Sequence, residues 1–149
     1  MADPGLLRVI HAAGAVLLLG NVTVTGFWAA YLYRARERVP FRPVARAILW
    51  ADLVFTVAGA SMLVVSGILL MRVREYTLAE NPWLRQGIGA LAASTVLWLV
   101  FLLPDQWRLE RADPADDAAL RRIFRRWSAV GWAATACLFY GLWAMVSKG

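Results

Sequence analysis

One histidine, His11, is the side chain with the clearest capacity for chemistry in this chain of 149 residues. It lies inside the first of four long apolar segments, and an ionisable side chain at membrane depth is costly and usually functional. A single imidazole cannot make a zinc site, but it can be an axial ligand of haem iron. The one cysteine, Cys137, provides no disulfide and no metal cluster, so the chemistry expected here depends largely on His11.

The surroundings of this imidazole suit a flat, iron-bearing macrocycle. Gly14 lies one helical turn further along the same face, and Ala15 beside it is small, so we expect room there for a porphyrin. Met62, in the second apolar segment, is the best-placed thioether for a second axial position. Two arginines at the same end of the segments could hold the haem propionates: Arg8 and Arg72. The sequence therefore predicts a haem b site with His11 as the iron ligand; a second histidine would have to come from another subunit.

A second polar group is centred on Asp52, in the second apolar segment. Because neighbouring segments run antiparallel, we expect Asp52 at the depth of Asn21 and Thr25 in the first segment. Its carboxylate can accept hydrogen bonds from both or pair with Arg46, and such contacts hold membrane helices together. The alternative is a proton relay or an ion path, which ionisable membrane residues also serve. No chain of titratable groups links Asp52 to His11, so a structural polar cluster is the favoured interpretation.

Four apolar segments must position these residues. Hydrophobic residues make up 60% of the chain, which is more than a soluble domain of this length can bury. Each segment has roughly the 20 residues that a membrane-spanning helix needs. The expected spans are residues 6–33, 44–71, 83–103 and 126–146, with the third ending at Pro104. We therefore predict an all-α membrane protein, a single four-helix antiparallel bundle that occupies residues 1–149.

A short amphipathic stretch, residues 112–126, precedes the fourth span. Apolar side chains recur here at helical spacing opposite several arginines: Leu120, Ile123, Phe124 and Trp127. This pattern is typical of helices that lie in the membrane interface. We expect an interfacial lead-in that continues into the fourth helix and anchors it.

The basic residues set the expected orientation in the bilayer. The loops between spans one and two and between spans three and four carry eleven of the 16 Lys and Arg residues, which leaves five for the other side. The positive-inside rule then places both termini outside the cytoplasm, in a bacterial-type inner (plasma) membrane. Contacts with lipid headgroups explain the formal net charge of +6, and no basic stripe for nucleic acid is present.

The first span has a polar face and an apolar face. Small and polar residues share the face of His11, and the opposite face carries four large apolar side chains: Val9, Val16, Val24 and Phe27. Polar side chains of membrane helices turn toward the bundle interior. We therefore expect the apolar face to meet lipid.

Three stretches of the first span are distinctive: residues 7–11 (LRVIH), 17–22 (LLLGNV) and 26–28 (GFW). The second span adds Asp52, Leu53, Phe55, Thr56, Gly59 and Gly67. With these residues the chain resembles a family of small four-span integral membrane proteins of unknown function. The resemblance extends over essentially the whole chain and implies a fold rather than an activity. The wider superfamily looks similar to the copper-resistance-D-like membrane proteins and to the small membrane protoporphyrinogen oxidases of haem synthesis.

The resemblance to those oxidases bears on His11. They carry a histidine early in span one, at the position of His11, and that histidine is implicated in haem binding. They also carry a second histidine near the end of span one, where this chain has Tyr33 and Arg34, and a Trp-Phe-Gly-like signature that this chain lacks. The resemblance therefore implies haem binding through His11 but does not extend to the oxidase activity.

Three functions remain open at this point. The chain has no Ser-His-Asp arrangement, phosphate loop or carboxylate pair, which favours a protein that is not an enzyme. It could bind haem b through His11 for electron transfer or haem handling. It could be a non-catalytic subunit or scaffold of a larger membrane complex, or a homodimer, with His11 as a packing residue. It could also be a small transporter or metal-handling protein that uses Asp52 and His11.

Overall fold

The protein is built from helices, as the computed structural model of residues 3–113 and 115–147 shows. The first long helix is α1 (Pro4–Arg34). The second comprises α2 (Phe41–Ala51), the π-helical turn η1 (Asp52–Thr56) and α3 (Val57–Arg74). The third comprises α4 (Pro82–Leu97), the π-helical turn η2 (Trp98–Leu102) and α5 (Leu103–Arg111). The fourth is α6 (Asp117–Ser147).

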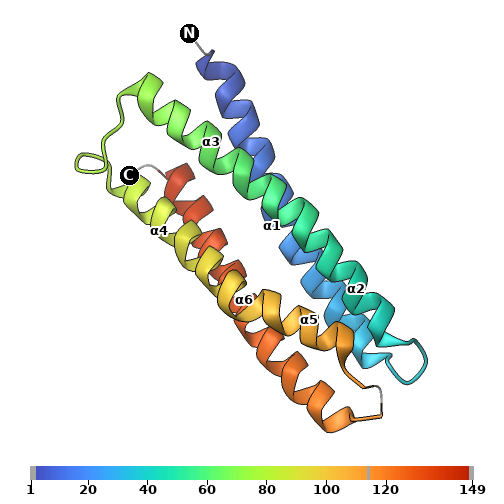
Figure 1. Ribbon diagram of the computed structural model, residues 1–149. Coiled ribbons are helices and arrows are strands. Elements are labelled where there is room, and N and C mark those ends of the chain that lie inside the picture. Colours follow the sequence, from blue (N-terminus) through green and yellow to red (C-terminus); the bar gives the residue numbers. More distant parts are fainter. Residues whose placement is uncertain (1–2, 114, 148–149) are drawn as a thin grey trace.

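These four long helices pack antiparallel, so that α1 begins and α6 ends at the same end of the molecule (Figure 1). Each is long and apolar enough to cross a membrane. The predicted all-α bundle of four membrane-spanning helices is therefore confirmed.

Local chemistry sets where the first two long helices begin. The carboxylate of Asp3 caps α1, because its two oxygens accept hydrogen bonds from the backbone N–H groups of Gly5 at 2.9 Å and Leu6 at 3.3 Å. The second long helix begins at Phe41 rather than at residue 44. Pro43 then falls in the first turn, where a backbone N–H would have no helical partner, so the proline does not interrupt the helix.

The third long helix does not end at Pro104, contrary to the prediction from the sequence. Proline usually interrupts a helix because it lacks an N–H group and its ring clashes with the carbonyl of the preceding turn. Here η2 directly precedes the proline, and in this wider turn the Leu103 N–H bonds to the Trp98 carbonyl. The wider turn accommodates the ring. The helix continues to Arg111 and thereby brings Gln106 into the bundle.

Most of the amphipathic stretch before the fourth span belongs to α6, as expected, because this helix begins at Asp117. Its apolar side chains Leu120, Phe124 and Trp127 are buried in the protein core. The Phe124 ring stacks on Tyr33 with centroids 3.8 Å apart and meets the edge of Phe41 at 5.7 Å. The lead-in therefore packs, through Phe124, on the aromatic side chains where α1 turns into α2.

Two close helix pairs make up the bundle, α1 with α3 and α4 with α6. In the first pair two glycines face each other, because a Cβ built on Gly59 would lie 3.0 Å from the carbonyl oxygen of Gly14. In the second pair, a Cβ built on Gly141 would lie 3.1 Å from the Cβ of Ala90. Small residues at both crossings let the helix backbones approach closely, as in other membrane helix pairs.

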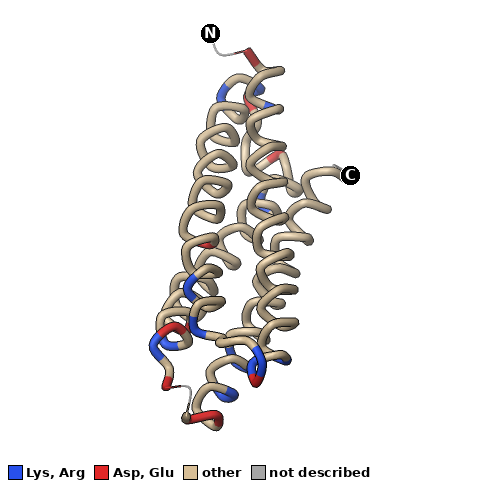
Figure 2. The backbone as a smooth tube through the Cα atoms, turned by 90° about the vertical axis from the view of Figure 1, so that its right-hand side faces the viewer, with Lys and Arg blue, Asp and Glu red and all other residues tan. Residues whose placement is uncertain are grey.

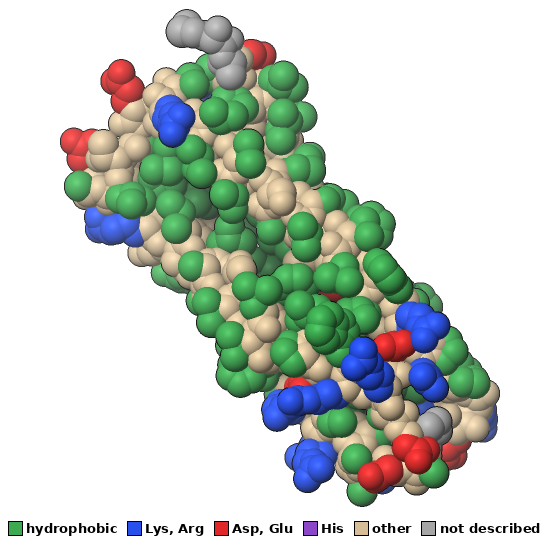
Figure 3. Space-filling model, in the orientation of Figure 1, with side chains coloured by type: hydrophobic (Ala, Val, Ile, Leu, Met, Phe, Trp, Pro, Cys, Tyr) green, Lys and Arg blue, Asp and Glu red, His purple; other side chains and the backbone are tan. Residues whose placement is uncertain are grey.

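Hydrophobic side chains cover the middle of the molecule, and charged side chains gather toward its two ends (Figure 3). The predicted lipid-facing residues of α1 are exposed, with exposed fractions of 65% for Val9, 74% for Val16, 54% for Val24 and 59% for Phe27. Gly14 and Leu18, on the opposite face, are buried. The predicted division of this helix into an outward apolar face and an interior face is confirmed.

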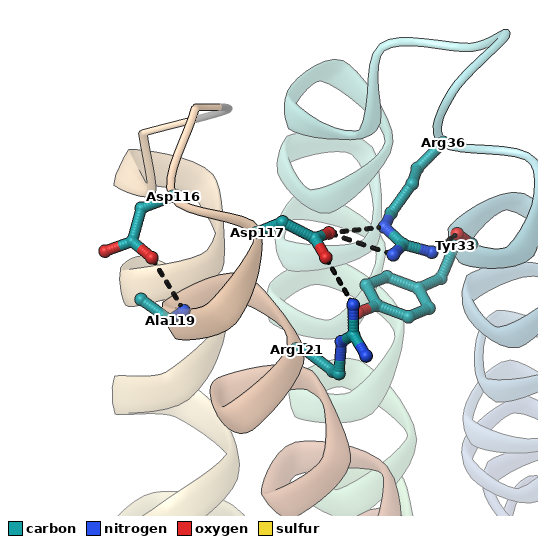
Figure 4. Close-up of polar contacts among 6 residues, drawn as sticks. All are labelled: Tyr33, Arg36, Asp116, Asp117, Ala119 and Arg121. Carbon is teal, nitrogen blue, oxygen red and sulfur yellow. Dashed lines mark hydrogen bonds and ion pairs between the residues drawn. The ribbon is translucent and has the colours of Figure 1, made fainter.

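Basic side chains crowd the end where α1 turns into α2 and α5 leads to α6 (Figure 2). There Asp117, at the start of α6, binds two of them: its Oδ1 lies 2.9 Å from Arg36 and its Oδ2 lies 2.6 Å from Arg121 (Figure 4). The Arg36 guanidinium also lies over the Tyr33 ring, 4.5 Å from its centroid. Because Tyr33 belongs to α1, these contacts hold the start of α6 against the end of α1.

Candidate functional site

Asp52, at the start of η1, is the centre of a buried hydrogen-bond cluster that joins three of the four long helices. Its Oδ1 accepts hydrogen bonds from Asn21 Nδ2 at 2.8 Å and from the Thr25 hydroxyl at 3.5 Å, both from α1. Its Oδ2 accepts one from Gln106 Nε2 in α5. Asn21 Nδ2 also lies 3.2 Å from Thr56 Oγ1. The three residues that the sequence placed in one polar cluster are thus brought together, and Gln106 and Thr56 join them.

The carboxylate of Asp52 is held by uncharged donors. Arg46, the arginine considered as its partner, instead pairs with Glu110 at 2.7 Å. Arg126 pairs with Asp105, the residue before Gln106. Within residues 3–113 and 115–147, no Lys or Arg side chain forms an ion pair with Asp52. The Arg46 alternative is therefore corrected: that guanidinium bonds to a carboxylate at the charged end of the bundle.

Asp52 also fixes the orientation of the Gln106 side-chain amide. The amide turns its NH₂ group toward Asp52, because Nε2 donates to Oδ2 of that side chain. The other end of the amide, Oε1, is buried and has no hydrogen-bond partner among the described residues. Gln106 is only 2% exposed. The contact with Asp52 thus fixes the orientation of Gln106 Oε1, which stays a buried acceptor without a donor among the described residues.

A partly enclosed cavity of about 200 Å³ adjoins this cluster. All four long helices contribute to its walls. The polar part of the lining includes Asp52, Thr56, Ser94, Gln106 and Ser128, and the aromatic part consists of Trp98, Trp127 and Trp132. The cavity therefore combines a few polar groups with a mainly apolar wall, as small-molecule sites in proteins do.

Both π-helical turns border this cavity. Asp52 and Thr56 come from η1, and Trp98 and Leu102 come from η2. Such turns are rare and occur frequently at functional sites. Two of them, in two different helices and beside one cavity, mark this level of the bundle as the candidate site.

Two more lining residues carry buried polar atoms that lack a partner. The indole Nε1 atoms of Trp98 and Trp127 have no hydrogen-bond acceptor among the described residues. Trp127 is 8% exposed. Leaving a buried donor or acceptor unpaired costs about 1–3 kcal/mol. Three residues that line the cavity therefore carry buried polar atoms without a partner among the described residues. They are two donors, Nε1 of Trp98 and of Trp127, and one acceptor, Oε1 of Gln106.

His11 lies elsewhere, on α1 nearer the end that holds the termini, and it is not among the residues that line this cavity. Its Nδ1 is 3.0 Å from Ser66 Oγ. The Ser66 hydroxyl donates its proton to the Met62 carbonyl, so its oxygen acts as acceptor and Nδ1 of His11 carries a proton. The ring also packs on Gly67, where an added Cβ would lie 3.3 Å from Cε1.

The room that the sequence predicted beside Gly14 for a porphyrin is filled. A Cβ built on Gly14 would lie 2.9 Å from the Cβ of Met62 and 3.0 Å from the Gly59 carbonyl oxygen. Gly14 therefore serves the close contact of α1 with α3, and the expectation of free space there is wrong. Met62 packs at the same crossing.

The other residues proposed for the haem site lie around this crossing or beyond it. Ala15 is half-buried on α1. Arg8 and Arg72 are exposed, near the start of α1 and the end of α3. A single chain thus places His11 beside Ser66 and Gly67 but forms no porphyrin-sized space at Gly14.

The cavity residues that sequence reasoning missed are Gln106, Trp98 and Trp127. Gln106 lies beyond the third span as the sequence predicts it, since that span ends at Pro104. Trp98 falls inside the predicted third span and Trp127 at the end of the amphipathic stretch before the fourth, and neither position by itself indicates a ligand. A signal for Gln106 was available, since it continues the spacing of four residues from Ser94 through Trp98 and Leu102.

Comparison with known proteins adds a family. No curated protein and no solved structure matches the chain. One family model, described as "Predicted integral membrane protein (DUF2269)", matches residues 5–149, which is nearly the whole chain. The four apolar helices agree with that description. The chain therefore belongs to this family of predicted integral membrane proteins, for which no function is known.

Proposed function

We infer that this integral membrane protein binds a small, uncharged ligand at membrane depth, in the cavity beside Asp52 and Gln106. One observation carries the proposal: three residues that line one cavity each leave a buried polar atom without a hydrogen-bond partner among the described residues. Native proteins pair nearly all such atoms, with protein, with ordered water or with a ligand. A charged ligand would pay a large desolvation cost at this depth, so an uncharged one is favoured.

The size of the cavity supports a ligand as well as water. A cavity of about 150 Å³ with apolar walls is able to hold a benzene molecule, and the cavity here has about 200 Å³. Its walls carry three indole rings, which offer flat apolar surface to a ring-shaped molecule. Ordered water could form hydrogen bonds with the polar atoms, but it would make no favourable apolar contact with the indole rings. Water alone is the alternative that the experiment must exclude.

Two glycines of α1 provide a matched pair of variants for this test. Gly26 lines the cavity and Gly20 does not, and a Cβ added at either one meets nothing within 4 Å. Gly26→Leu should therefore fill the cavity without a backbone clash, whereas Gly20→Leu should leave it open. Both changes replace glycine by leucine in the same helix, so their effect on helix propensity is matched.

The measurement is nuclear Overhauser contact between toluene and the protein in deuterated detergent. We expect contacts from toluene to the methyl groups of Leu91 and Leu138, both in the cavity wall, in the unmodified protein and in Gly20→Leu. They should be lost in Gly26→Leu. Equal contacts in all three proteins, or contacts only at lipid-facing methyl groups such as those of Val16, would contradict the proposal.

Haem binding through His11 is the second candidate, and one observation favours it. Ser66 is placed to accept an Nδ1 proton, because its own hydroxyl donates to the Met62 carbonyl, and ligating histidines commonly donate their other N–H to a neighbour in this way. The close contact at Gly14 means that a porphyrin would have to lie outside the α1–α3 crossing or between two copies of the chain. An absorption spectrum decides: a Soret band that is lost in His11→Ala supports this candidate, and no band after growth with added haem removes it.

A further inference from the structure

We propose that the ligand of the Asp52 cavity carries a ring hydroxyl, as phenols and quinols do. This inference rests on the proposed function, because it names the chemistry of the ligand for the same cavity. It is argued from which donors and acceptors of the lining are already used and which are left over.

The groups left over on the donor side are two indoles. An indole N–H can donate a hydrogen bond but cannot accept one. The Nε1 atoms of Trp98 and Trp127 are buried and have no acceptor among the described residues. Two of the lining hydroxyls are used internally, since Thr95 donates to the Leu91 carbonyl at 2.8 Å and Thr135 donates to the Gly131 carbonyl at 2.9 Å. An acceptor on the ligand would give one of the indole N–H groups a partner.

On the acceptor side, the group left over is Gln106 Oε1. Asp52 holds the amide so that Nε2 faces the carboxylate, and Oε1 is left as a buried acceptor without a donor among residues 3–113 and 115–147. Asp52 itself already accepts from Asn21, Thr25 and Gln106. A donor on the ligand would likewise give Oε1 a partner, and Asp52 acts as a positioning residue that decides which end of the amide is available.

A hydroxyl group meets both demands at once. It accepts from an N–H and donates its own proton, whereas an ether or a carbonyl only accepts and an ammonium group only donates and is charged. The indole walls and the volume of about 200 Å³ suit one six-membered ring with a small substituent. A ring hydroxyl is the simplest uncharged group that can both donate to an acceptor such as Gln106 Oε1 and accept from an indole N–H.

The test uses three probes that share one ring and differ in hydrogen bonding. Phenol accepts and donates, anisole only accepts, and toluene does neither. Their dissociation constants are measured by calorimetry on the purified full chain in detergent micelles, after correction for the partitioning of each probe into empty micelles. We expect phenol to bind about tenfold more tightly than anisole, the ratio that one net hydrogen bond provides.

Asp52→Asn sharpens the test because it should reverse the Gln106 amide. The new amide would keep its oxygen toward the Asn21 donor and turn its NH₂ group toward Gln106, so that Oε1 becomes bonded and Nε2 is left over. The preference for phenol over anisole should then disappear. Gln106→Met, which keeps the length of the side chain and removes both polar groups, should abolish the preference as well and serves if Asp52→Asn does not fold.

The outcomes separate this inference from the proposed function. If phenol, anisole and toluene all bind in the cavity with equal affinity, the ring-hydroxyl inference is wrong and the proposed function stands. If none of the three binds beyond its partitioning into micelles, both are wrong and water fills the cavity. A preference for phenol that persists unchanged in Gln106→Met would also overturn the inference, because the acceptor would then lie elsewhere.

Discussion

Helix α1 carries two polar sites, and they differ in how many helices they join. His11 makes a hydrogen bond with Ser66 of α3, within one close helix pair. About three turns further along, Asn21 and Thr25 bond to Asp52, which in turn accepts a hydrogen bond from Gln106 of the third long helix. The second site therefore ties the two helix pairs together, whereas the first adds to a contact that the glycines at the crossing already make.

The two sites also differ in what lies beside them. The space next to Gly14 and His11 is taken up by α3. The space next to Asp52 is a cavity whose lining leaves three polar atoms without partners among the described residues. His11 and Asp52 are both polar side chains that are costly to place in a membrane, so that cost does not distinguish them. The unpartnered polar atoms near Asp52 are what separate a candidate binding site from a contact that helps helices pack.

The largest effect on stability is expected from Asp52→Ala. Removing the carboxylate leaves the buried donors of Asn21 and Gln106 without their acceptor, which we expect to lower the free energy of unfolding by about 2–4 kcal/mol. The measurement is unfolding by dodecyl sulfate titration in mixed micelles, followed by circular dichroism. Asp52→Asn, which retains an acceptor for Asn21, is the control and should cost less. A change below about 0.5 kcal/mol for Asp52→Ala, within the range of ordinary surface substitutions, would show that the cluster does not tie the helix pairs together.

The next largest effect is expected from Gly14→Leu, which tests whether the space beside His11 is filled. Its Cβ would lie 2.9 Å from that of Met62 and 3.0 Å from a backbone oxygen, so overpacking should cost about 1–3 kcal/mol. Gly20→Leu, with nothing within 4 Å of its Cβ, is the matched control in the same titration. Equal stability of the two variants would mean that α1 and α3 do not touch at Gly14, and the space for a porphyrin would be open again.

A smaller effect is expected from Ser66→Ala. It removes a single hydrogen bond within the α1–α3 pair, and such bonds in membrane proteins contribute about 0.6 kcal/mol on average. The loss of stability should therefore be several times smaller than that of Asp52→Ala in the same assay. A loss as large as that of Asp52→Ala would reverse the ranking of the two sites.

The smallest effect is expected from Arg46→Gln. Its guanidinium is 60% exposed and pairs with Glu110 at the charged end rather than with Asp52, and exposed ion pairs contribute little. The midpoint of unfolding should be unchanged within error. If this variant instead destabilised the protein as strongly as Asp52→Ala does, Arg46 would be the missing counter-ion of the carboxylate.

Much of the fold could be predicted from hydropathy and helical spacing, and the reason is physical. Val9, Val16 and Val24 share one face of α1 because only an apolar face tolerates lipid, and all three are exposed. The pairing of Asp52 with Asn21 and Thr25 followed from antiparallel depth alone. The exposed face depends on the residue spacing within one helix. The pairing depends only on the depths of residues in two neighbouring antiparallel helices.

The features that the sequence did not predict depend on contacts between distant segments. Pro104 gave a strong signal for a helix end, and only the π-helical turn before it lets the helix continue to Gln106. The burial of Phe124 depends on Tyr33 and Phe41, which lie far away in the chain. Gly14 is small both where a ligand fits and where a helix packs, so its residue type alone does not separate the two.

The most direct test of the central claim follows the indole N–H groups themselves. The protein is labelled with ¹⁵N at its tryptophan side chains, phenol is titrated in, and the signals are assigned with Trp98→Phe and Trp127→Phe. The account predicts that the Trp98 and Trp127 resonances move downfield and saturate, as N–H groups do when they gain an acceptor, while the signal of Trp28, which is 49% exposed, stays in place. Equal, non-saturating shifts of all indole signals, or movement of Trp28 alone, would mean that phenol enters the detergent and not the cavity.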